Sequence, residues 1–132
     1  MKRILFSIFL LALSLTLTAA PAANRDDWKR LGQKEVDHKA ERDEIIVGAD
    51  EGTFKRIKLE VNKSDVEFIN VRVVYASGDD ENLDIRQKIK AGGETRAINL
   101  DGRNRLIRKV IFAYRTDRGE RKRAVVVLYG LR

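Results

Sequence analysis

The chain contains no cysteine among its 132 residues. It therefore cannot form a disulfide, supply a thiolate to a metal or carry a lipid on a lipoprotein-type cysteine, and a hydrophobic core must hold it together. Its one histidine, His38, lies in the charged stretch "EVDHKAERDE". A transition-metal site would then need carboxylates for its other ligands, which is uncommon for zinc. We therefore predict no cofactor, and we expect His38 to be an exposed residue of a charged loop.

Recognisable catalytic motifs are missing as well. The sequence has neither a G-x-S-x-G elbow nor a glycine-rich phosphate-binding loop. The loop "SGDDENLD" could serve a carboxylate-based enzyme, but a catalytic pair needs a defined pocket and separation, and this loop supplies only charge. We therefore predict a protein that is not an enzyme, and keep the carboxylate-based enzyme as the weaker alternative.

The same loop is the candidate for a metal site. From Asp80 the string D-E-N-L-D begins like an EF-hand, whose oxygen ligands suit calcium. Ile85 then occupies the position that requires glycine, and Ala91 takes the place of the bidentate glutamate, so the specific motif fails. A looser calcium site between loops is the alternative to a solvated turn. Its carboxylates would be Asp79, Asp80 and Asp84.

The N-terminal stretch "MKRILFSIFLLALSLTLTAAPAAN" has two cations, an apolar run and then small residues, which is typical of a secretory signal peptide. Ala20 and Ala22 fit an A-x-A site, so we predict a signal peptide over residues 1–22 and one domain over residues 23–132. An uncleaved anchor is the alternative, but the apolar run is short for a bilayer span. Cleavage would leave a periplasmic protein without a membrane span, or alternatively a secreted one.

Apolar alternation runs through the rest of the chain. In "FKRIKLEV", Ile57, Leu59 and Val61 share one face, which is typical of a half-buried strand. In "VEFINVRVVYASG", simple alternation places Ile69 with Val71 on one face and Phe68 on the other, which predicts a central strand covered partly on both sides. Turn signals between such runs leave no room for helical crossovers. These patterns predict an all-β protein, a single antiparallel, jelly-roll-like β-sandwich of about eight strands.

Four segments carry a resemblance to a known family. They are "FKRIKLEV", "DVEFINVRVVYASG", "LDIRQKIKAGGETRAINLDG" and "RLIRKVIFAYR", between Thr53 and Arg115. In their order and turns they resemble a family of small exported bacterial proteins known only as a domain of unknown function. The resemblance implies a signal peptide followed by a β-sandwich, and it implies no activity or catalytic residue.

Positive charge is concentrated in the last quarter of the chain. Residues 103–132 hold 10 basic and 2 acidic side chains, whereas residues 23–102 hold 15 and 18. The basic stretch "RNRLIRKVIFAYRTDRGERKR" also fits a helical period, but its β-branched and aromatic residues favour a strand. A bulge at Arg108 and Lys109 would direct these cations outward and place an apolar row inward. That inward row would be Ile107, Val110, Phe112 and Tyr114.

Pairing of this strand with "RKRAVVVLYGL" across the "DRGE" turn would make a basic C-terminal hairpin. Arginine dominates the stretch and suits phosphate and carboxylate, although a solvated edge strand protected by charge is an equal interpretation. We predict a binding module whose partner is an anionic envelope polymer, a lipid head group or an exported protein; export argues against nucleic acid. A structural or inhibitory module recognised through its loops is the alternative. The candidate contact residues are Arg103, Arg105, Arg108, Lys109, Arg115, Arg118, Arg121, Lys122 and Arg123.

Overall fold

The computed structural model describes residues 27–39, 41–102, 104–117 and 122–132. The proposed signal peptide lies outside these residues, and in the part that is described no helix is long and apolar enough to cross a membrane. The elements are β1 (Trp28–Glu35), β2 (Arg42–Ile46), the 3₁₀ helix η2 (Ala49–Glu51), β3 (Thr53–Phe54), β4 (Arg56–Asn62), β5 (Val66–Tyr75), β6 (Asp80–Leu83), β7 (Gln87–Ile89), β8 (Ile98–Asn99), β9 (Arg105–Thr116) and β10 (Val125–Leu131).

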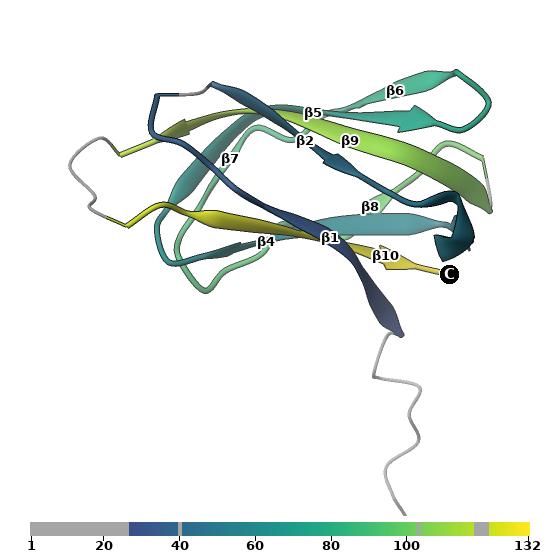
Figure 1. Cartoon of the computed structure of the whole chain (residues 1–132), viewed down its shortest axis with the longest axis horizontal. Coiled ribbons are helices and arrows are strands. Elements are labelled where there is room, and N and C mark those ends of the chain that lie inside the picture. The colour runs from purple at the N-terminus through teal and green to yellow at the C-terminus, as the bar shows by residue number, and fades with distance from the viewer. Residues whose placement is uncertain (1–26, 40, 103, 118–121) are drawn as a thin grey trace, which may run out of the picture.

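The strands form two sheets that lie face to face (Figure 1). One has the order β1-β10-β4-β8, and the other has the order β2-β9-β5-β6, with β3 added to β9 and β7 added to β5. Every pairing is antiparallel. The predicted antiparallel β-sandwich is therefore confirmed. The described residues form strands β1 to β10, two more than the expected eight. Two of them, β3 and β8, have only 2 residues each, so they are too short to recognise as strands in the sequence.

Alternating apolar residues of both sheets fill the space between them. Ile57, Leu59 and Val61 of β4 are fully buried, as the period-2 pattern predicts. In the opposite sheet Phe112 of β9 packs edge-on against Phe68 of β5, with ring centroids 5.9 Å apart. Edge-to-face packing of this kind is a favourable arrangement for aromatic rings. One continuous core results, as expected for a domain of this size.

A bulge changes the facing of β5. The pairing with β9 shifts register between Phe68 and Asn70, so that Ile69 is an extra residue. Phe68 and Val71 consequently both face the core and are fully buried, whereas Ile69 is only half-buried. The prediction that Phe68 and Val71 lie on opposite faces is wrong, because a one-residue insertion reverses the alternation that follows it.

The bulge predicted in β9 is present. Val74 pairs with Lys109 and Tyr75 with Ile107, so Arg108 is the residue left without a partner across the ladder. As a result Ile107 and Val110 both face the core, while Arg108 is exposed. The strand interpretation of this segment is therefore confirmed, and the helical one is wrong.

The predicted basic hairpin does not form. β9 pairs with β2, β3 and β5, whereas β10 pairs with β1 and β4, so the two strands belong to different sheets. β9 and β10 lie in opposite layers of the sandwich (Figure 1). This arrangement has a physical reason: each strand has a buried row, with Phe112 in β9 and Leu128 in β10, and opposite layers let both rows enter one core.

Candidate functional site

The basic residues of the C-terminal quarter that the structure describes do not form one patch. β9 has 12 residues, and at about 3.3 Å per residue its two ends lie roughly 35 Å apart. Arg105 lies at one end and Arg115 at the other, so no single ligand group can contact both. Three members of the predicted set, Arg103, Arg118 and Arg121, lie outside the described residues.

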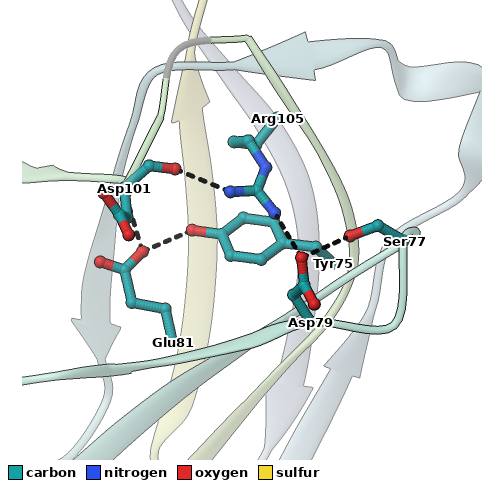
Figure 2. A network of polar contacts seen from close by, with 6 residues as sticks. All are labelled: Tyr75, Ser77, Asp79, Glu81, Asp101 and Arg105. Carbon is teal, nitrogen blue, oxygen red and sulfur yellow. Dashed lines mark hydrogen bonds and ion pairs between the residues drawn. The ribbon is translucent and has the colours of Figure 1, made fainter.

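Arg105 is held in a network at the end of the sandwich (Figure 2). Its guanidinium carbon lies 3.8 Å from the centroid of the Tyr75 ring, within cation–π range. Its Nη1 donates a hydrogen bond to the carbonyl oxygen of Asp101 at 2.9 Å, and its Nη2 lies 3.8 Å from Oδ2 of Asp79. These contacts make Arg105 a part of the structure rather than an available contact for a ligand.

Tyr75 is the centre of this network. Its hydroxyl donates to Oε1 of Glu81 at 2.5 Å, and the backbone N–H of Asp101 donates to the same oxygen at 2.8 Å. Burial first, and then the hydrogen bond to the Glu81 carboxylate, raise the pKa of Tyr75 above its ordinary value. The phenol therefore stays protonated and serves as a fixed donor, which suits a structural role better than proton transfer.

The carboxylates of the predicted calcium loop point to separate partners. Asp79 faces Arg105, and Asp80 forms an ion pair with Arg72. The described residues contain no group of three or more acidic or histidine side chains that could hold a metal ion. In the described residues Asp79 and Asp80 are therefore each paired with an arginine and are not gathered with Asp84 into one group of three ligands.

His38 is not the exposed loop residue that we expected. It is half-buried, and its Nδ1 lies 3.1 Å from Oγ1 of Thr116 at the end of β9. Nearby, the hydroxyl of Tyr114 donates to Oδ2 of Asp43 at 2.7 Å. Asp37 and His38, which follow β1, thus lie against the end of β9. This contact depends on the pairing of distant strands, so the local composition around His38 does not predict it.

Two of the remaining predicted cations lie on the outer face of β9. Lys109 lies 3.3 Å from Glu44 of the neighbouring strand β2. Arg108 is exposed at the bulge, where its carbonyl oxygen accepts a hydrogen bond from the N–H of Val47 at 2.9 Å. Surface pairs of this kind contribute little to stability.

A basic cavity lies at the other end of the sandwich. Its volume is about 470 Å³, and among the described residues its lining consists of Lys63, Lys122 and Arg123 with one carboxylate, Glu35. Glu35 lies 3.8 Å from Arg123, which leaves the two lysines in excess. We call Lys63, Lys122 and Arg123 the basic end. It is the place where the fold gathers cations of the predicted set.

Lys63 was missed at the level of sequence. It lies in the turn "NKSD" between β4 and β5, where its φ of 71° places it in the left-handed region. The sequence predicts the turn itself. It does not predict that this turn lies beside Lys122 and Arg123, because those residues are about 60 positions further along the chain and only the fold brings them to the same end of the sandwich.

Arg115 lies in different surroundings. It lines a second cavity of about 290 Å³ together with Asp65, Glu67, Asp117 and Lys88. Among the described residues three carboxylates outnumber two cations there, so this cavity is not electropositive. Thr116 completes its lining.

The fold and these surfaces define a small two-layer antiparallel β-sandwich protein with a basic cavity at one end. A family model described as "Domain of unknown function (DUF2541)" matches residues 7–130, and the chain belongs to this family. The search of curated proteins gave no match to the chain, and neither did the search of solved structures. The resemblance found in the four strand segments is thereby confirmed as membership of a domain family of unknown function.

Proposed function

We propose that this protein is an exported, non-enzymatic binding module, and that the basic end contacts an anionic component of the cell envelope. The observation that carries the proposal is the cavity of about 470 Å³, to whose lining the described part of the chain contributes three cations and one carboxylate. The contact surface is therefore narrower than the predicted set of nine residues, and it includes Lys63 in addition.

Charge and exposure favour an anion as the ligand of this cavity. Lys63, Lys122 and Arg123 are all exposed, so they can approach a phosphate or carboxylate without a large desolvation cost. Arginine offers a planar fork and the lysines offer mobile point charges, a combination that accepts several geometries of a polymer or head group. Exposed contacts of this kind weaken as salt is added, because the Debye length falls from about 10 Å at 0.1 M to about 3 Å at 1 M.

The test is co-sedimentation with anionic vesicles and with isolated cell-wall polymer at low and high salt. The chain is expressed with its own N-terminal segment and purified after export, and mass spectrometry of the product shows whether cleavage follows Ala22. We expect retention at low salt that is lost at high salt. The variant with Lys63, Lys122 and Arg123 changed to glutamine should lose retention at least tenfold.

A matched control removes the same charge elsewhere. Lys55, Arg56 and Arg108 are exposed and lie outside the basic cavity, so their change to glutamine should reduce retention only slightly. Equal losses for the two triple variants would show that net charge alone acts, and would contradict the proposal. Retention that does not depend on salt would favour a protein partner recognised through the loops.

A further inference from the structure

A further, smaller hollow lies on the outer face of the β2-β9-β5 sheet, apart from the basic end. Its volume is about 150 Å³, and its lining comprises Arg42, Asn70, Arg72, Ile111 and Ala113. The strand pairing explains why it exists. Ala113 of β9 faces Arg42 of β2 on one side and Asn70 of β5 on the other, so a small side chain lies between long polar ones.

The two arginines lie on opposite sides of this hollow. Arg42 belongs to β2 and pairs with Ala113 of β9, whereas Arg72 belongs to β5 and pairs with Ile111 of β9. β2 and β5 are the two strands that flank β9. Neighbouring strands lie about 4.8 Å apart, so the two arginine strands are separated by roughly 10 Å, which two arginine side chains can span together. Both guanidinium groups can therefore reach one ligand placed over Ala113.

The surrounding charges favour a ligand with one negative charge. Arg72 forms an ion pair with Asp80, which restrains it while its side chain remains 49% exposed. Glu44, which faces Ile111, is 3.3 Å from Lys109. For Arg42 no ion pair is found within the described segments. The five charged groups thus sum to about +1, which matches a carboxylate better than a phosphate dianion.

The floor of the hollow adds a second preference. Ile111 and Ala113 are apolar and half-buried, and the amide of Asn70 lies beside them. Such a floor suits a small apolar group next to the carboxylate, while the amide can exchange hydrogen bonds with a neighbouring peptide group. We propose that this hollow binds the carboxylate of a small acylated amino acid or of a peptide C-terminus with a short side chain. This site is independent of the proposed function of the basic end.

The test is an NMR titration of the isotopically labelled, purified chain with N-acetylalanine. We expect saturable shifts at the methyl group of Ala113 and the side-chain amide of Asn70. N-acetylalaninamide, which lacks the carboxylate, should give no such shifts, and inorganic phosphate should bind at least tenfold more weakly. Equal shifts with N-acetylalaninamide would overturn the assignment of ligand class. Tighter binding of inorganic phosphate than of N-acetylalanine would overturn it as well.

Two variants test the location of the site. Ala113→Val fills the hollow with a side chain that strands favour, and it should abolish the shifts at Asn70 without lowering the melting temperature. Arg42→Gln should weaken binding about tenfold. Unchanged affinity in both variants would overturn the proposal. The variant with Lys63, Lys122 and Arg123 changed to glutamine should bind N-acetylalanine normally, so the two sites can fail separately.

Discussion

Tyr75 and Tyr114 lie at opposite ends of the β2-β9-β5-β6 sheet, and each carries the same arrangement of groups. Both are buried, and each donates its hydroxyl hydrogen to a carboxylate, Glu81 for Tyr75 and Asp43 for Tyr114. Each hydrogen bond ties an adjacent segment to a core strand. At the scale of single residues, therefore, polar side chains close both ends of an otherwise apolar core.

These tyrosines predict a loss of stability at alkaline pH. Burial, followed by the hydrogen-bonded carboxylate, raises the pKa of both phenols above the value of about 10 that they have when unfolded. Their contribution is therefore complete below about pH 10 and is lost above it, because only the unfolded chain then releases the protons. We expect the free energy of unfolding to fall by up to about 1.4 kcal/mol per pH unit for each tyrosine.

Urea unfolding between pH 8 and pH 11 measures this slope. The double variant Tyr75→Phe with Tyr114→Phe keeps every lysine and arginine, so it retains their titration and loses only that of the two phenols. It should be less stable than the wild type by about 2 kcal/mol at pH 8 and should show a shallower decline above pH 10. Parallel declines in the two proteins would contradict the assigned role of the hydroxyls.

At the scale of elements, bulges and one glycine determine how the strands pack. The extra residues Ile69 in β5 and Arg108 in β9 reset the alternation so that each strand presents its apolar residues to the core. In β10, Gly130 lies where a side chain would enter the core: a Cβ there would be 2.7 Å from the Phe54 ring and 2.8 Å from Leu31. The sheets can approach at this point only because the residue has no side chain.

Gly130→Ala should therefore destabilise the protein by about 1–3 kcal/mol, because the added methyl group forces Phe54 or Leu31 to move. Urea unfolding of the variant at neutral pH measures the change. Val125→Ala, on the half-buried outer face of the same strand, should cost less than about 1 kcal/mol. A Gly130→Ala protein as stable as the wild type would show that the contact is easily relieved.

At the scale of the whole molecule, stability depends on a single core without covalent support. The chain has no disulfide, and the buried side chains of both sheets form one cluster. A domain of this size has a free energy of unfolding of about 5–15 kcal/mol, so the loss of one large core residue removes much of it.

Phe112→Ala tests this dependence. Phe112 is fully buried, with the rings of Phe68 and Tyr114 at centroid distances of 5.9 Å and 5.5 Å. We expect a loss of about 3–5 kcal/mol, seen as a drop in the midpoint of chemical unfolding. Arg108→Ala, which removes an exposed side chain from the same strand, should change stability by no more than about 0.5 kcal/mol. A small effect of Phe112→Ala would show that the core can close around the cavity.

Much of the fold could be predicted from local pattern because strand alternation is a property of neighbouring residues. Ile57, Leu59 and Val61 alternate without interruption, and the bulge in β9 could be placed because its apolar residues are out of phase on either side of Arg108. The bulge in β5 could not be placed, since "FINV" is apolar enough to fit either phase. Only the pairing with β9 shows which residue is extra.

For the candidate sites, too, some features follow from the sequence and others only from the tertiary structure. The sequence by itself determined three features: the lack of cysteine excludes disulfides, apolar alternation with closely spaced turns predicts antiparallel strands, and the order of charged residues gives an excess of cations near the C-terminus. The tertiary structure decided that β9 and β10 lie in different layers, that Arg105 stacks on Tyr75, and that Lys63 joins Lys122 and Arg123. The physical reason is that strand propensity acts over a few residues, whereas the grouping of charges depends on which distant strands share a core.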